Sequence, residues 1–373
     1  MKEIRFGIIG LGLMGKEFAS AAARWFHLTE IDVKPVIVAV CDTNKEAITW
    51  FETNLPSISF TTTNYKELLA QDDIDAIYCA VPHSLHEQIY VDIIKAGKHL
   101  IGEKPFGIDK KANDNINKII AKHPEVLVRC SSEFPFFPGA YEIIKAIENN
   151  ELGQIIEVEA GLLHSSDMNP DKAINWKRII KFNGEYGCMG DLGMHVLHIP
   201  LRFGWQPTDI KAQLSNIIKT RPDGKGSTAK CETWDNATIL AKVEQDNYSF
   251  PITLHTKRIA PGNTNNWFIK VHGLKRSMEF STKEPKTLKL LDYKKGQRQA
   301  WQNIELGYES AYKTITGGIF EFGFSDAMLQ MFAAFCDELE HPQNMLQNFH
   351  CVTPEEASKS HDIFTTALKT NNA

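Results

Sequence analysis

The stretch Ile4 to Gly15 reads IRFGIIGLGLMG, and it decides the fold of the chain. A short apolar run, typical of a buried strand, leads directly into three glycines with the spacing G-x-G-x-x-G. In such a loop the first glycine allows a tight turn, the second lets the backbone approach a pyrophosphate, and the third lets the next helix pack on the strand. Residues 16–23 favour a helix, and a helix N-terminus offers N–H groups to anions. This context favours a dinucleotide loop over a plain turn, with candidate binding residues Gly10, Gly12, Leu13, Met14 and Gly15.

The length and charge of the chain restrict its class. A chain of 373 residues exceeds what one hydrophobic core usually serves, so we expect two domains. There are 41 Lys and Arg against 46 Asp and Glu, and this net charge of -5 is not that of a protein that binds nucleic acid or an anionic membrane. The expected ligand is therefore a small molecule.

The cysteines and the apolar segments indicate a compartment. Seven cysteines are scattered without a C-x-x-C pair, which predicts reduced thiols and no metal knuckle. No run approaches the ~20 apolar residues of a membrane span, and no cleavage-type region follows the first apolar stretch. We therefore expect a cytoplasmic protein that does not enter a membrane.

Up to about residue 132, short β-rich runs alternate with helical runs, as in a doubly wound parallel sheet. The expected strands are Ile4–Ile9, Val36–Cys41, Ala76–Ala80, His99–Gly102 and Val126–Cys130. Helices are expected at Tyr65–Ala70 and at Leu85–Ala96, where Gly97 suits a C-cap, while residues 24–35 resemble a helix end followed by a loop. This pattern predicts an N-terminal Rossmann domain over residues 1–130.

After Gly153 the pattern changes to longer alternating runs with few helices between them, which favours an antiparallel sheet. The expected strands are Ile155–Leu163, Ala237–Val243, Ile252–Lys257, Phe268–His272 and Thr287–Leu291, and the expected helices are Asp191–Phe203 and Ser325–Leu339. We therefore predict that residues 131–373 form an α+β domain with a large, mostly antiparallel open sheet, which binds substrate and mediates oligomerisation.

Asp42 follows the second expected strand, where an acid can bind the ribose hydroxyls of NAD. A 2′-phosphate beside this carboxylate would meet a repulsion of roughly 4 kcal/mol for unit charges ~4 Å apart at surface-like dielectric. NAD is therefore favoured over NADP, although Lys45 would soften the preference. The alternative is that Asp42 is only a turn or cap residue.

Three further motifs follow in the first half: AVPHSLH from Ala80 to His86, AGKH from Ala96 to His99, and Glu103-Lys104-Pro105. Their order resembles the family of glucose-fructose oxidoreductase, inositol dehydrogenase and MocA (Gfo/Idh/MocA). In the second half, GCMGDLGMH from Gly187 to His195 resembles the glycine-rich lead of that family into Asp-x-Gly-x-x-His. The resemblance covers most of residues 1–130 and roughly 150–205, and returns weakly at 353–357.

The resemblance implies an NAD(P)-dependent oxidoreductase in which Lys104 supplies a cation, His195 acts as acid/base, and Asp191 orients the substrate or His195. Oxidation of a secondary alcohol needs such groups, because the hydroxyl proton must leave while hydride leaves the same carbon. Asp191 and His195 are four residues apart, so they share one face of a helix. The Lys104-Pro105 bond is expected to be cis by the same resemblance. Cofactor contacts are expected at Ala80, Pro82, His83, His86, Glu103 and Lys104, and the two histidines would cap or line the loop rather than catalyse.

Substrate contacts are expected at Trp176, Lys177 and His198, although a core role for Trp176 is equally consistent with the sequence. The chain departs from the family pattern at two places: Ser132-Glu133-Phe134 stands where many members have Asn-Arg-Phe, and His198 stands where Asp is frequent. These departures bear on the substrate more than on the type of reaction.

Each candidate has a simpler alternative. Lys104 would be a surface lysine, and Asp191 with His195 a helix pair worth ~0.2 to 0.5 kcal/mol. Asp191, His195 and His198 would also suit a metal ion, but no established metal motif supports that reading, and we expect no metal.

The favoured function is hydride transfer between NAD, or NADP, and a secondary hydroxyl or ketone of a sugar, polyol or related ring. Two other functions stay open: an NAD-dependent glycoside hydrolase of the same fold, and a non-catalytic regulator that binds NAD and a sugar. An open sheet with one uncovered face tends to pair with a second copy, so a homodimer or homotetramer is expected.

Overall fold

The computed structural model describes residues 1–307 and 310–371, which form two compact units. The first unit contains Met1–Glu133, Ser310–Gly317 and Gly323–Ala357, and the second contains the rest of the described chain. The expected division into residues 1–130 and 131–373 treats each domain as one continuous piece, whereas both units of the structure are discontinuous. Within these described ranges, no helix combines the length and the apolar character needed to cross a bilayer.

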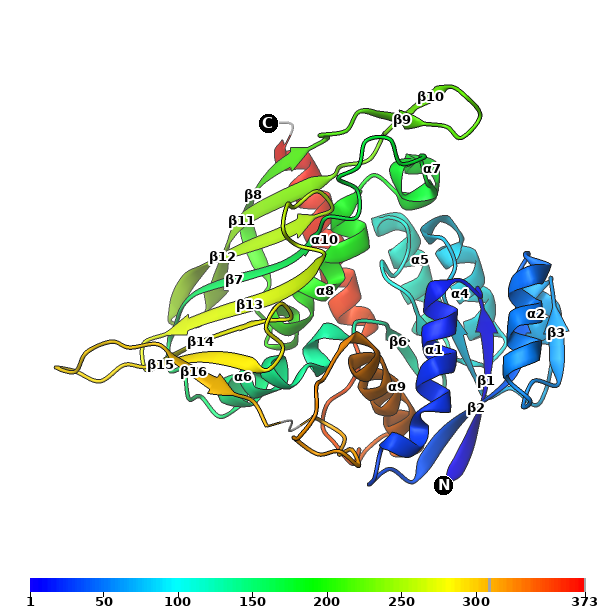
Figure 1. The fold of residues 1–373 in the computed structure, drawn as a ribbon, viewed down its shortest axis with the longest axis horizontal. Helices are drawn as coiled ribbons and strands as arrows, with labels where there is room; N and C mark the ends of the chain where they lie inside the picture. Colours follow the sequence, from blue (N-terminus) through cyan, green and yellow to red (C-terminus); the bar gives the residue numbers. More distant parts are fainter. Residues whose placement is uncertain (308–309, 372–373) are drawn as a thin grey trace. The chain divides into compact units, whose positions relative to one another are not determined.

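The first unit is built on a six-stranded parallel sheet in the order β3-β2-β1-β4-β5-β6, which confirms the predicted Rossmann fold (Figure 1). Its strands are β1 (Lys2–Ile9), β2 (Val33–Cys41), β3 (Phe60–Thr62), β4 (Ala76–Cys79), β5 (His99–Gly102) and β6 (Val128–Cys130). Its helices are α1 (Leu13–Ala23), α2 (Lys45–Asn54), α3 (Tyr65–Leu69), α4 (His86–Lys95), α5 (Lys110–Ile120) and α9 (Phe324–Glu340), with short 3-10 turns η1 (Trp25–His27) and η2 (His83–Leu85). The expected β5 is reproduced residue for residue.

Strand β2 begins earlier than the sequence suggests. Residues 33–35 lie in the strand rather than in a loop, and Pro35 faces Ile4 of β1. Proline lacks the N–H that a residue of a central strand donates to a neighbouring strand. It is accommodated here because β3 pairs only with Ala39–Cys41, which leaves Pro35 on an unpaired edge.

Helix α9 belongs to the first unit although it lies far along the sequence. Phe332 packs on Phe18 of α1 with ring centroids 4.3 Å apart, and Arg24 binds Asp326 at 2.9 Å. Figure 1 shows α9 beside α1. The helix covers apolar surface that α1 and the sheet alone would leave exposed, and for this reason the unit is not continuous in sequence.

The second unit holds an eight-stranded sheet in the order β16-β15-β14-β13-β7-β12-β11-β8. All neighbours are antiparallel except β7 and β12, so the predicted mostly antiparallel sheet is confirmed. The strands are β7 (Ile155–His164), β8 (Pro207–Ser215), β11 (Asn236–Gln245), β12 (Tyr248–Lys257), β13 (Asn265–Gly273), β14 (Arg276–Ser281), β15 (Thr287–Asp292) and β16 (Gln302–Glu305), with a separate hairpin of β9 (Thr220–Pro222) and β10 (Thr228–Lys230). The helices are α6 (Pro138–Glu148), α7 (Ile180–Asn183), α8 (Cys188–Arg202) and α10 (Pro354–Asn371), with 3-10 turns η3 (Phe134–Phe136) and η4 (Trp176–Arg178). The first residues of α10 group with the other unit.

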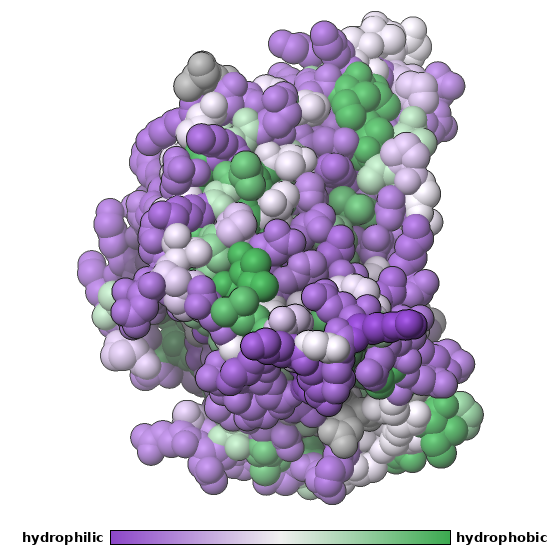
Figure 2. All heavy atoms as spheres, turned by 90° about the vertical axis from the view of Figure 1, so that its left-hand side faces the viewer, coloured by the Kyte–Doolittle hydropathy of each residue, from purple (hydrophilic) through white to green (hydrophobic). Residues whose placement is uncertain are grey.

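One face of this sheet is covered and the other is open. Alternate residues of β13 such as Trp267 and Ile269 are fully buried, on the face that α8 and α6 cover in Figure 1. The residues between them, such as Phe268 and Lys270, are only partly buried. Figure 2 shows that this side of the molecule is mainly hydrophilic, with separate apolar patches. The period of two therefore places an apolar core on one side and a mixed polar surface on the other.

Candidate functional site

The three glycines of the first loop meet the requirements of a pyrophosphate cradle. Gly10 has a φ of +95°, and a Cβ there would lie 2.4 Å from the carbonyl oxygen of Ala80. A Cβ at Gly15 would lie 2.5 Å from the carbonyl oxygen of Gly10, so only glycine lets α1 approach β1 this closely. A Cβ at Gly12 would meet nothing within 4 Å. The second glycine therefore keeps open the space that a phosphate would need.

Helix α1 begins at this open space without a side-chain cap. Its N-cap is Gly12, which has no side chain to accept from the N–H groups of the first turn. Leu13 and Met14 are the first two helical residues, so their backbone N–H groups lack an intrahelical acceptor. Uncapped N–H groups and the positive end of the helix dipole together suit an anion, and the loop fits a dinucleotide such as NAD.

Asp42 lies directly after β2 and is tied to the glycine loop. Its Oδ2 accepts from the Leu11 amide at 2.7 Å, and its Oδ1 accepts from the Asn44 amide at 2.8 Å. The contact with Asn44 is that of a turn residue. The contact with Leu11 fixes the carboxylate beside the glycine loop. The geometry is therefore compatible with both the turn role and ribose binding.

The loop after β4 carries Ala80, Pro82, His83 and His86, and His86 ties it to the loop after β5. The Nδ1 atom of His86 lies 2.6 Å from the Pro105 carbonyl oxygen, and Nε2 lies 3.0 Å from that of Val81. Burial lowers the pKa of His86 to about 4, so the ring is neutral at pH 7. His83 is also buried. The structure places both histidines inside this loop, consistent with a supporting role.

Lys104 follows β5 at the carboxyl edge of the parallel sheet. The preceding residue, Glu103, is held by two tyrosines: Tyr78 donates its hydroxyl to Oε1 at 2.8 Å, and Tyr90 donates to the carbonyl oxygen at 2.7 Å. The Lys104-Pro105 peptide bond is cis, as expected. Strands β1, β4 and β5 are successive neighbours, so the glycine loop and Lys104 lie two strand spacings apart, about 10 Å.

In the second unit, helix α8 carries Asp191 and His195 one turn apart. It starts at Gly187, which has a φ of +58° and packs on the backbone of Trp234, where a Cβ would lie 2.6 Å from the Trp234 nitrogen. The glycine-rich lead is therefore needed for the sharp entry into α8. Asp191 and His195 are both nearly buried.

The carboxylate of Asp191 is held by two cations. The Nζ atom of Lys177 lies 3.1 Å from Oδ1 and 3.0 Å from Oδ2, and Arg258 lies within 3.0 Å of Oδ2. The Lys177 side chain is 40% exposed, whereas that of Arg258 is 3% exposed. Lys177 is therefore the member of this group that solvent or a ligand reaches.

Arg258 is a site residue that the sequence analysis missed. Besides Asp191, it donates to the Lys177 carbonyl oxygen at 3.1 Å and to Oδ1 of Asn183 at 3.4 Å. Thr233 donates to the same Lys177 carbonyl at 2.8 Å. The only local signal is an arginine directly after the expected strand 252–257, and nothing in the sequence links it to a partner 67 positions away.

His195 is fixed by aromatic neighbours. Its carbonyl oxygen accepts from the Trp267 indole at 2.9 Å, and its ring meets the ring of Phe134 edge-on at 5.1 Å. Trp176, another predicted substrate residue, lies under the Lys177 ammonium, 5.7 Å from Nζ to the ring centroid. His198, on the same helix as His195, is fully buried, so a substrate would reach it only if its neighbours moved.

The surroundings of Asp191 bear on the alternative that Asp191, His195 and His198 bind a metal ion. Asp191 faces two cationic side chains, which is an unfavourable setting for a metal ion. Across residues 1–307 and 310–371, no cluster of three or more His, Cys, Asp or Glu side chains has the arrangement of a metal site.

Comparison with known proteins shows similarity to oxidoreductases. Residues 4–129 match the model of the Gfo/Idh/MocA oxidoreductase family, described by its NAD-binding Rossmann fold. Levoglucosan dehydrogenase of Pseudarthrobacter phenanthrenivorans is 22% identical over 295 residues, which cover 75% of this chain and 74% of that protein. Inositol 2-dehydrogenase/D-chiro-inositol 3-dehydrogenase of Halalkalibacterium halodurans is 28% identical over 158 residues, 42% of this chain and 43% of that protein.

An uncharacterized oxidoreductase of Synechocystis is 27% identical over 222 residues, which span 58% of its length and 59% of this chain. The chain thus matches between two fifths and three quarters of these relatives. Among solved structures, levoglucosan dehydrogenase in complex with NADH and L-sorbose has a TM-score of 0.88 at 19% identity, covering 100% of this chain and 97% of that one.

Proposed function

We propose that this chain, whose residues 4–129 match the model of the Gfo/Idh/MocA oxidoreductase family, is an NAD-dependent dehydrogenase of a secondary hydroxyl on a sugar, polyol or related ring. In the reverse direction it would reduce the corresponding ketone. The observation that carries this proposal is the shared sheet edge of the first unit, where an open glycine cradle lies two strands from Lys104.

The chain supplies the groups that alcohol oxidation requires. NAD, when bound, accepts hydride from the substrate carbon. In its neutral form Lys104 Nζ takes the hydroxyl proton, and the ammonium that results is the cation that stabilises the negative charge developing on the oxygen; the resemblance assigns His195 the role of a further acid/base. Asp191 holds the Lys177 ammonium, which donates a hydrogen bond to a substrate hydroxyl.

The substrate class follows from the side chains that Lys177 brings together. An ammonium group beside an aromatic ring, here Trp176, suits a ring that carries both C–H faces and hydroxyls. Two relatives are named as dehydrogenases of levoglucosan and of inositol, which are polyhydroxylated rings. We therefore place the substrate among uncharged polyhydroxylated rings.

NAD is the expected cofactor rather than NADP. The Asp42 carboxylate is fixed beside the Leu11 amide, where it would accept from a ribose hydroxyl and repel a 2′-phosphate. An Asp42→Asn variant keeps an acceptor oxygen but removes the charge, and we expect its preference for NAD over NADP to fall about tenfold or more. An unchanged ratio of kcat/KM for the two cofactors would contradict this role.

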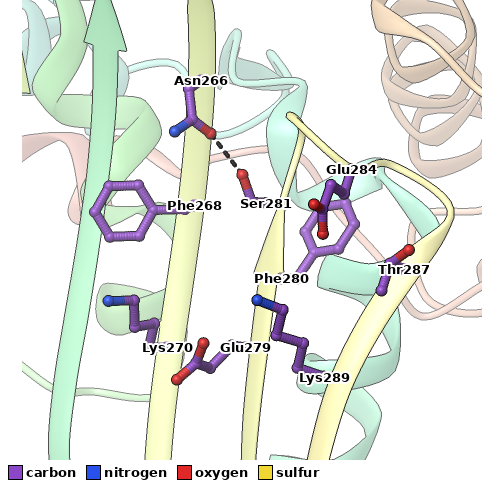
Figure 3. Close-up of a pocket in the computed structure, with 9 residues that line it drawn as sticks. All are labelled: Asn266, Phe268, Lys270, Glu279, Phe280, Ser281, Glu284, Thr287 and Lys289. Atoms are coloured by element: carbon purple, nitrogen blue, oxygen red, sulfur yellow. Dashed lines mark hydrogen bonds between the residues drawn. The ribbon is translucent and has the colours of Figure 1, made fainter. Parts of the chain in front are cut away.

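The open face of the second sheet is the surface proposed to pair with a second copy. This face carries positive and negative side chains close together, and Lys270 binds Glu159 at 2.7 Å. A shallow cavity of about 270 Å³ on this face is lined by residues that include Lys270, Lys289, Glu279 and Glu284 (Figure 3). A two-fold contact would set lysines of one copy against glutamates of the other. A monomeric mass by light scattering at micromolar concentration would contradict this homo-oligomer.

The test of the function is a panel of cyclitols, sugars and ketoses with NAD or NADH, followed by NADH absorbance. We expect NAD reduction with at least one polyhydroxylated ring. Glycoside cleavage without net NADH formation would point to the hydrolase instead, and NADH binding without turnover on the whole panel would point to a regulator.

A further inference from the structure

Glu133 lies at the same sheet edge as Lys104. Strand β6 pairs with β5 in register Gly102 to Cys130, and the Ser131 amide donates to the Gly102 carbonyl oxygen at 2.9 Å. The residues that follow each strand, Glu103 with Lys104 and the segment ending at Glu133, therefore leave the sheet side by side.

The surroundings of Glu133 differ from those of an ordinary surface glutamate. Glu133 is only 3% exposed, and Glu103 is 7% exposed. Glu103 accepts from the Tyr78 hydroxyl at 2.8 Å, which fixes its side chain at this edge. The charged groups that act on Glu133 are Glu103 and Lys104 from the β5 edge and Glu17 from α1.

Burial and the charge of Glu103 raise the pKa of Glu133 to about 8, against the opposing effect of Lys104 and a backbone hydrogen bond. Glu133 is therefore protonated at neutral pH and becomes a carboxylate within the range in which dehydrogenases are assayed. A carboxyl group that changes its charge beside a lysine is suited to exchange protons with it.

We propose that Glu133 is the proton-exchange partner of Lys104: in alcohol oxidation it takes the proton that Lys104 has removed from the substrate hydroxyl, and in ketone reduction it returns one. This inference rests on the proposed function. In oxidation the hydroxyl O–H bond breaks and an N–H bond forms at Lys104 Nζ, while the hydride leaves with its electron pair for NAD. The Glu133 carboxylate then accepts the proton from Nζ, which regenerates the neutral amine, and the resulting carboxylic acid later releases the proton to solvent.

The protonation state of Glu133 predicts at which pH the Glu133→Gln substitution should lower kcat. Below about pH 7 the wild-type side chain is already protonated and accepts nothing, so Glu133→Gln, which mimics the neutral acid, should match wild-type oxidation within about twofold. Above about pH 8.5 the wild type has a carboxylate and the variant does not. We expect the kcat of the variant to be about tenfold lower there, with KM and the Kd of NADH unchanged, since Glu133 is assigned no contact with either ligand.

The experiment measures kcat and KM for oxidation from pH 6 to 9.5 in wild type, Glu133→Gln and Glu125→Gln. Glu125 is an exposed residue before the opposite end of β6, so its variant should follow the wild-type profile. A second readout, independent of turnover, is carbon-13 NMR of glutamate carboxyls in the cofactor-free protein. One carboxyl should titrate near pH 8 in wild type and be missing from Glu133→Gln.

The outcomes separate this proposal from the function on which it rests. If the kcat of Glu133→Gln falls below that of the wild type only above pH 8, and the NMR titration matches, the exchange role is supported. If the wild type forms NADH and the Glu133→Gln profile runs parallel to it across the whole range, the exchange role is overturned and the dehydrogenase function stands. If no substrate gives NADH, the function fails and the exchange role with it.

Discussion

The two units build their functional residues in different ways. In the first unit, the candidates occupy loops that directly follow β1, β2, β4 and β5, so one parallel sheet brings them to one edge. In the second unit, Asp191 is held by Lys177 from a 3-10 turn and by Arg258 from the end of a strand. The first arrangement is a property of the backbone, and the second depends on side chains that reach across the fold.

This difference has a consequence for mutational effects. Changes at the edge of the parallel sheet should affect chemistry or cofactor binding and leave the fold intact, because the strands hold the loops. Changes in the Lys177, Asp191 and Arg258 group should affect activity and stability together, since Asp191 and Arg258 are buried and their charges depend on each other.

The largest expected effect is that of Lys104→Ala. Loss of the proton acceptor should lower kcat by about 10³-fold or more, whereas the Kd of NADH should change little. Lys110→Ala, at a partly exposed helix start where Lys110 pairs with Asp114, is the matched control and should retain wild-type activity. Turnover by Lys104→Ala close to that of wild type would remove the lysine from the mechanism.

The next largest effect is expected for Arg258→Lys. Lysine keeps the charge but cannot bridge Asp191, the Lys177 carbonyl and Asn183 at once, so kcat/KM should fall by about 10- to 100-fold with a lower Tm. Arg276→Lys, in a partly exposed pair with Asp292 on the same sheet, is the control. If both variants behave alike in steady-state kinetics and thermal melts, the group around Asp191 has no special role.

The stability of the wild type and of Glu133→Gln should depend differently on pH. Folding raises the pKa of Glu133 from the ordinary value near 4.5 to about 8, so between these values the folded state binds the proton that the unfolded state has lost. Wild-type stability should therefore fall as the pH rises from about 5 to 8, by ~2 to 4 kcal/mol relative to Glu133→Gln. A Tm difference that stays constant across this range would show that Glu133 does not titrate in the folded protein as described.

The smallest effect is expected at Gly12, and Gly10 is its natural partner in the test. An alanine methyl at Gly12 meets no protein atom within 4 Å, so Gly12→Ala should keep the wild-type Tm and weaken NADH binding about tenfold. At Gly10 a positive φ and the nearby Ala80 carbonyl oppose any side chain, so Gly10→Ala should lower the Tm. Normal NADH binding by a folded Gly12→Ala protein would contradict the cradle assignment.

Much of the first unit was predictable because its signals are local. The alternation of apolar runs and helices predicts the parallel sheet, and β5 is predicted with its bounds. The early start of β2 was missed because Pro35 reads as a breaker, and only the tertiary fact that β3 is short makes proline acceptable there. The grouping of α9 with α1 has no sequence signal, since it depends on packing between residues such as Phe18 and Phe332.

In the second unit the sequence predicts the sheet and helix α8 but not the surroundings of Asp191. The spacing of Asp191 and His195 indicates a shared helix face, which the structure has. The contact of Arg258 with Asp191 depends on where β12 ends relative to α8, and no short motif encodes that. The expectation that Asp191 itself orients a substrate is therefore refined: its oxygens are engaged by Lys177 and Arg258, and Lys177 is the exposed member.

Single-turnover transfer of deuterium tests directly whether this protein moves hydride from a polyhydroxylated ring to NAD. Wild-type protein would be mixed with NAD and a polyhydroxylated ring substrate, identified in the panel, that carries deuterium on the oxidised carbon, and the NADH analysed by mass spectrometry. We predict one deuterium in each NADH formed by the wild type, and deuterium transfer about 10³-fold slower with Lys104→Ala, although that variant still binds NADH. Protein that binds NADH yet transfers no deuterium from any substrate in the panel would contradict the account.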